Sequence, residues 1–112
     1  MPDSRTKEGV MDEPERAFAK AMRDVYVRAK TEAGYNATYF LRMLSDHGPI
    51  DTARRLITST QPSEGFTQLW QRGRIDLTVE ATVLRPEFVD LFTDEERDAC
   101  RRRLKEYGDN AS

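Results

Sequence analysis

Three side chains of this sequence could carry acid–base chemistry. Asp76 and Glu80 are four residues apart, so they would share one face of a helix. Two carboxylates can act as general acid and general base when their surroundings push their pKa values apart. His47 is the only histidine, and histidine is the residue type that most readily exchanges a proton near neutral pH. One hypothesis is therefore a small enzyme that uses Asp76, Glu80 and His47.

The two acids also fit a structural role, and the sequence favours it. Asp76 stands where the N-cap of a helix is expected. Arg72 and Arg74 are close enough along the chain to neutralise either acid. Polar groups at the start of a buried helix must find partners. We therefore interpret Arg74, Asp76 and Glu80 as a structural polar network.

The remaining reactive residues do not form a recognisable metal or nucleophile site. His47 comes just before Gly48 at a predicted helix end, where an imidazolium interacts well with the helix dipole. Cys100 is the only cysteine, so it can pair with no other cysteine of this chain, and one His with one Cys cannot complete a structural zinc site. Its place on the inward face of a predicted helix favours burial over reactivity. We expect no catalytic residue, no metal ligand and no cofactor.

Arginine is unusually frequent, with 14 Arg against 4 Lys. Arginine makes bidentate contacts with phosphate, so its clusters could bind nucleic acid. The clusters lie at residues 54–55, at Arg72 with Arg74, and at 101–103. Acids surround each of them, and the net charge is −2, so no long-range field attracts a polyanion. These charges make nucleic-acid binding less favoured than a protein partner. A nucleic-acid-associated protein with an arginine-rich face is the main alternative.

Two aromatic residues beside arginines suggest a surface for another protein. Tyr39 precedes Arg42, and Trp70 precedes Arg72. Tyr, Trp and Arg contribute most strongly to protein interfaces when they are exposed. Core packing is the alternative interpretation for Trp70. We predict a candidate interface of Tyr39, Arg42, Trp70 and Arg72, and a non-enzymatic protein–protein interaction or regulatory module whose partner is another protein.

Length and composition define the framework that must position these residues. The chain has 112 residues, of which 38% are hydrophobic and 34% charged, as expected for one small globular domain. No run of 18 apolar residues could cross a membrane, and the first eleven residues do not resemble a signal peptide. Together with the single cysteine, this predicts a cytoplasmic protein without membrane contacts.

Capping signals and apolar periodicity predict a compact all-α domain of five or six helices with a long first helix. The first helix begins at Asp12-Glu13-Pro14-Glu15 and ends at Gly34. Further helices are predicted at 36–47, with Asn36 as N-cap, at 51–59, at 63–73 after Ser63, and from the capping box at 93–96 to Gly108. The helical domain covers residues 12–107, between flexible tails at 1–11 and 108–112.

Residues 75–83 are ambiguous. Apolar and polar residues alternate there, which is typical of a half-buried strand. No other segment alternates, however, and a strand without a partner would leave backbone groups unpaired. We therefore predict a short, largely buried helix.

Several short motifs carry a resemblance to known proteins. They are Leu69-Trp70, the series Arg74-Ile75-Asp76-Leu77-Thr78-Val79-Glu80, and Leu91-Phe92-Thr93. With them, residues 26–104 resemble a small family of uncharacterised bacterial helical proteins. The resemblance implies a bacterial, cytoplasmic origin, and it carries over no activity, cofactor or site residue.

Overall fold

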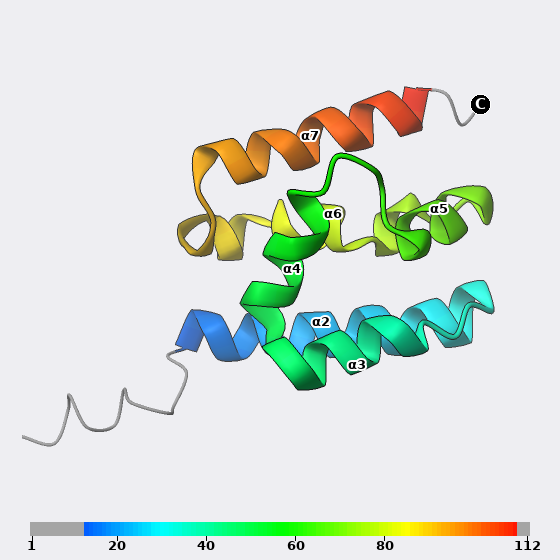
Figure 1. Cartoon of the computed structure of the whole chain (residues 1–112), viewed down its shortest axis with the longest axis horizontal. Helices are drawn as coiled ribbons and strands as arrows, with labels where there is room; N and C mark the ends of the chain where they lie inside the picture. The colour runs from blue at the N-terminus through cyan, green and yellow to red at the C-terminus, as the bar shows by residue number, and fades with distance from the viewer. Residues whose placement is uncertain (1–12, 110–112) are drawn as a thin grey trace, which may run out of the picture.

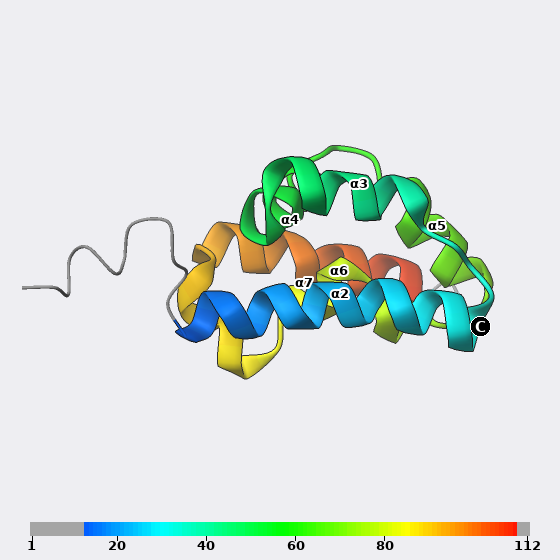
Figure 2. The same ribbon diagram turned by 90° about the horizontal axis from the view of Figure 1, so that it is seen from below.

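The computed structural model describes residues 13–109, and helix α2 (Glu13–Ala33) is its longest element. Buried residues recur along one side of this helix at three- and four-residue spacings, at Phe18, Met22, Val25 and Ala29. This stripe faces the rest of the chain, which packs along it (Figures 1 and 2). The predicted tail at 1–11 and residues 110–112 lie outside the described residues.

The other elements of residues 13–109 are helical as well, and no strand is among them. The prediction of a compact all-α domain with a long first helix is confirmed. After α2 come α3 (Thr38–His47), α4 (Pro49–Ile57), α5 (Glu64–Gln71), the 3-10 helix η1 (Ile75–Leu77), α6 (Val79–Val83), the 3-10 helix η2 (Pro86–Leu91) and α7 (Asp94–Asp109).

Helix ends agree with the sequence signals at some places and differ at others. Ser63 caps α5 by accepting a hydrogen bond from Phe66 N at 3.1 Å. Asn36 does not cap α3, because the N-cap is Ala37 and the Asn36 amide oxygen accepts a bond from the Tyr26 hydroxyl instead. Gly108 does not end α7, which continues to Asp109.

The short helix α6 lies at the centre of the fold. It packs against α2 on one side and against α4 and α7 on the others. In Figure 1, α7 runs above α6, α2 and α3 run below it, and α4 crosses from α3 towards α7. Four of its five residues are buried, so α6 is enclosed almost all round: Val79, Glu80, Thr82 and Val83.

The segment 75–83 is helical, as predicted, but Thr78 divides it into two helices. Thr78 has an extended backbone, and its hydroxyl oxygen accepts a bond from Ala81 N at 3.2 Å while donating to Ile75 O at 2.8 Å. Thr78 therefore ends η1 and caps α6. The expectation that Asp76 is the N-cap is wrong, because Asp76 lies within η1 and its side chain binds Arg74.

Replacing Thr78 with alanine should lower the free energy of unfolding by about 1 to 2 kcal/mol, because α6 loses its only side-chain cap in a buried position. Urea unfolding would measure the change. Thr31→Ala is the matched control, since Thr31 is exposed and its hydroxyl bonds only Val27 O within its own helix. That control should change stability by less than about 0.5 kcal/mol. Equal losses in the two variants would contradict the capping role of Thr78.

The main core lies between α2, α4, α6 and the η2 segment. Its largest side chains are aromatic, and Phe18 contacts Phe88 and Phe92 edge to face, with ring centroids 5.0 and 5.2 Å apart. A smaller cluster joins Ala29, Leu69 and Leu77 near the other end of α2. None of the described helices combines the length and the apolar composition that crossing a bilayer would require.

Candidate functional site

An apolar pocket of about 250 Å³ lies between α2, α3, α5 and α6. Helix α4 contributes one further lining residue, Leu56. The walls are mainly hydrophobic side chains, among them Val25, Phe40, Met43, Phe66 and Leu69. An apolar cavity of roughly 150 Å³ admits benzene. The pocket therefore has room for a group larger than one aromatic ring.

Two tyrosines line this pocket together with Gly65. Tyr39 is 71% exposed, whereas Tyr35 is half-buried. The Arg72 guanidinium carbon lies 5.6 Å from the centroid of the Tyr35 ring, in a cation–π contact. Burial, helped by the nearby charge of Glu64, raises the pKa of Tyr35. Tyr39 is itself part of the pocket lining. Arg72 is next to the pocket because it contacts the lining residue Tyr35.

Glu80 also lines the pocket, and it is the buried acid of the fold. Its side chain is 2% exposed, and Oε2 accepts a hydrogen bond from Arg103 Nη1 at 2.9 Å. Arg103 also donates to Leu56 O at 3.3 Å and to Ser59 O at 2.6 Å, so it ties α7 to α6 and to the end of α4. Burial raises the pKa of Glu80, and the hydrogen bond from Arg103 only partly opposes this effect.

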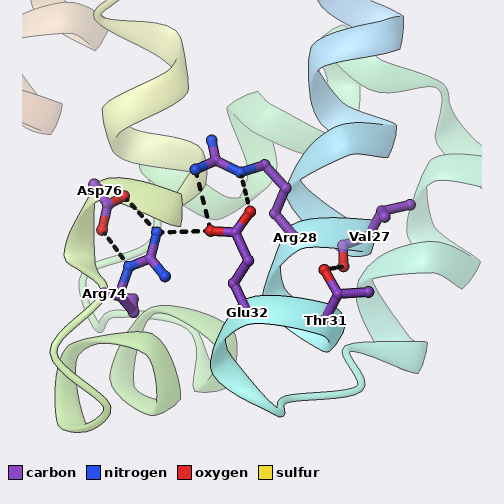
Figure 3. A network of polar contacts seen from close by, with 6 residues as sticks. All are labelled: Val27, Arg28, Thr31, Glu32, Arg74 and Asp76. Carbon is purple, nitrogen blue, oxygen red and sulfur yellow. Dashed lines mark hydrogen bonds and ion pairs between the residues drawn. The ribbon is translucent and has the colours of Figure 1, made fainter.

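Asp76 belongs to a different group of charges at the surface. Arg74 binds both Asp76 oxygens at 3.0 Å and Glu32 Oε1 at 2.9 Å, and Arg28 donates to both Glu32 oxygens, to Oε2 at 2.9 Å and to Oε1 at 3.2 Å (Figure 3). These bonds join the end of α2 to η1. Arg74 holds the pKa of Asp76 below its ordinary value, and Arg28 and Arg74 do the same for Glu32.

The structure therefore divides the predicted polar network in two. Arg74 and Asp76 form an ion pair, but Glu80 is not part of it and pairs with Arg103 instead. Asp76 and Glu80 do not share a helix face, because Thr78 breaks the helix between them.

His47 lies apart from both acids. Its Nδ1 is 3.8 Å from Asp51 Oδ2, one turn further along the chain, and it does not line the pocket that holds Glu80. The structure thus does not bring His47, Asp76 and Glu80 together. Among residues 13–109, no group of three His, Cys, Asp or Glu side chains could hold a metal ion.

Cys100 is fully buried. Desolvation, together with the charge of Glu80, raises the pKa of its thiol to about 12, so the thiolate is not formed near neutral pH. This agrees with the interpretation of Cys100 as a small buried hydrophobe.

The four residues of the predicted interface differ in exposure, because Tyr39, Arg42 and Arg72 are exposed and Trp70 is not. Trp70 is half-buried, donates from Nε1 to Tyr107 O at 3.0 Å, and packs edge to face on the Tyr107 ring. It therefore joins α5 to α7, which is the packing alternative. Arg42 is exposed on α3 and has no ion pair within the described part of the chain.

Helix α3 separates the pocket from a second, more open hollow. The second hollow lies beside α2 and the start of α4, and it includes Ala19, Arg23, Leu41, Leu44, Ser45 and Pro49. Leu41 is 41% exposed there. Tyr39 thus faces one hollow and Leu41 the other. We call Tyr39, Leu41 and Arg42 the α3 ridge.

The sequence did not reveal the pocket. Its lining comes from five helices and the loop after α2, and most of the lining residues are ordinary core residue types. One signal was available at Gly65, because a glycine inside a helix leaves space where another residue would place a side chain. A Cβ added there would meet Ser63 Oγ at 3.8 Å and Tyr35 Cε2 at 3.9 Å, which are ordinary contacts.

Comparisons with protein-family models, with curated proteins and with solved structures found no match. The resemblance to a family of bacterial helical proteins therefore stays a prediction.

Proposed function

We propose that this protein is a non-enzymatic interaction module that binds another protein through the α3 ridge. The exposure of this ridge is the observation that carries the proposal. Tyr39 and Leu41 are 71% and 41% exposed, and they are two of the four large hydrophobic residues exposed within residues 13–109. Tyrosine and arginine are among the residue types that most often dominate binding energy at interfaces.

The charged residues at and beside the α3 ridge indicate the chemistry of the partner surface. Arg42 and Arg23, from α3 and α2, have no ion pair within the described residues, and Arg23 lines the hollow next to Leu41. A partner surface that combines apolar side chains with a carboxylate complements this arrangement. Desolvation of Arg42 would then be compensated by a charge-assisted hydrogen bond.

The arginine clusters support a protein partner over nucleic acid. Within the described chain most of their members already hold a carboxylate, as in Arg54–Glu96, Arg55–Asp51, Arg74–Asp76, Arg101–Asp98 and Arg103–Glu80. Releasing them to phosphates would break these pairs. No arrangement of His47, Asp76 and Glu80 favours the enzyme alternative. A cytoplasmic location belongs to the same proposal, in line with one fully buried cysteine.

Tyr39→Ala and Arg42→Ala should each weaken binding of the partner at least about tenfold, as expected for central interface residues. The partner would be isolated from the host on the immobilised protein, identified by mass spectrometry, purified and titrated against each variant. Val89→Ala is the matched control, because Val89 is 46% exposed but lies on η2.

Unchanged affinity in both ridge variants would overturn the proposed surface. Micromolar binding of unrelated DNA or RNA at physiological salt, weakening steeply as salt rises, would favour the nucleic-acid alternative instead.

A further inference from the structure

The pocket that Glu80 lines supports a second inference, which rests on Glu80 and the pocket walls and shares only Tyr39 with the α3 ridge. We propose that this pocket binds a small, uncharged, mainly apolar molecule that donates one hydrogen bond to the Glu80 carboxylate.

The walls determine the apolar character of the ligand. Besides Glu80, the polar residues that line the pocket are Tyr35, Tyr39, Ser63, Glu64 and Thr78, and of these Tyr39 and Glu64 are exposed to solvent. The aliphatic hydroxyls are those of Ser63 and Thr78. Both hydroxyl oxygens already accept backbone N–H bonds as helix caps, and Thr78 also donates its proton to Ile75 O. The rest of the lining is largely hydrophobic. A strongly polar ligand would therefore lose its hydration and find few replacement partners.

Glu80 determines the single polar contact. Arg103 reaches one carboxylate oxygen, Oε2, at 2.9 Å, while an ionised carboxylate can accept about four hydrogen bonds. The carboxylate thus keeps accepting capacity at a site that is 98% removed from solvent, since its side chain is 2% exposed. A ligand N–H or O–H group complements it, whereas a ligand carboxylate would meet a like charge.

The ion pair between Arg103 and Glu80 favours an uncharged ligand. The Glu80–Arg103 ion pair carries no net charge, so a cationic ligand would compete with Arg103 for the carboxylate. The volume of about 250 Å³ exceeds that of a cavity that holds benzene, so a fused two-ring molecule fits the space. Indole combines this size with one N–H donor and is a suitable probe. Benzofuran has the same shape but lacks the donor.

The test compares these two probes on the 112-residue chain. Titration followed by amide NMR shifts should show saturable binding of indole with a Kd on the order of 0.1 to 1 mM. Benzofuran should bind at least about fivefold more weakly, because it lacks the N–H group that would donate to the Glu80 carboxylate. Indole-3-acetate should bind more weakly than indole because of its carboxylate.

Two variants at Gly65 test the location. Gly65→Leu should weaken indole binding at least about tenfold by filling the space beside Tyr35, whereas Gly65→Ala, whose added Cβ makes only ordinary contacts, should retain it. Circular dichroism confirms that both variants fold. Equal binding of indole and benzofuran would overturn the contact with Glu80. Failure of indole to saturate the wild-type protein, or unchanged binding in a folded Gly65→Leu variant, would overturn the pocket as the site.

Discussion

Replacing Arg103 with methionine should lower the free energy of unfolding at pH 7 by about 3 to 5 kcal/mol. Methionine keeps much of the side-chain volume but removes the charge. Glu80 would then be left as a carboxylate that is 2% exposed and has lost its ion-pair partner. The carbonyl groups of Leu56 and Ser59 would lose a donor as well. Such a loss is a large part of the 5 to 15 kcal/mol that stabilises an ordinary domain, so urea unfolding would detect it easily.

The loss of unfolding free energy caused by Arg103→Met should become smaller as the pH falls. Burial raises the pKa of Glu80 in the folded protein above its value in the unfolded chain. A group of this kind stabilises the folded state fully below its unfolded pKa, and this contribution is lost as the pH rises through the folded pKa. Removing Arg103 raises the pKa of Glu80 in the folded protein further, because the hydrogen bond from Arg103 that lowers this pKa is lost. The difference in unfolding free energy between the wild type and Arg103→Met should therefore become smaller from pH 7 towards pH 5.

Two comparisons separate this mechanism from a general packing effect. Arg74→Met removes the exposed partner of Asp76 and should reduce stability far less. The double variant Glu80→Gln with Arg103→Met should recover part of the loss, because a neutral amide is cheaper to bury than an unpaired carboxylate. A loss that stays equal between pH 5 and pH 7 would instead assign the effect of Arg103 to its carbonyl contacts.

The helices of this fold were largely predictable because their signals are local. Ser63 caps α5, and Thr93 with Glu96 forms the predicted capping box, in which each backbone N–H donates to the other side chain. The segment 75–83 was harder, since its alternation matched a strand and only the lack of a partner favoured a helix. The pattern gave no reason to place the break at Thr78, whose hydroxyl both ends η1 and begins α6.

The partner of Glu80 was predicted wrongly because the choice depends on distant packing. Arg72 and Arg74 were the expected partners because they are close along the chain, but α7 brings Arg103 to Glu80 from 23 residues away. The sequence did contain one clue. Arg103 is three residues after Cys100 and four before Tyr107, so it lies on the inward stripe of α7 while Arg101 and Arg102 are exposed. The pocket had no such signal, because it is space left between helices and no single residue encodes it.

Replacing Phe18 with alanine should also lower the free energy of unfolding by about 3 to 5 kcal/mol. Phe18 is fully buried, and its ring contacts Phe88 and Phe92 at centroid distances of 5.0 and 5.2 Å. The alanine variant loses the transfer free energy of the ring and leaves a cavity at the meeting point of α2 and η2.

The position of Phe18 explains which contact between elements the alanine variant would lose. It is one of the first buried residues of α2, so its ring joins the beginning of the longest helix to the η2 segment that leads into α7. Val27→Ala is the control, because Val27 lies on the same helix but is 50% exposed, and it should cost less than about 0.5 kcal/mol. Phe18→Leu should fall between the two, since leucine refills part of the cavity. If Phe18→Ala cost no more than Val27→Ala, the aromatic cluster would not be the contact that holds α2 to the rest of the domain.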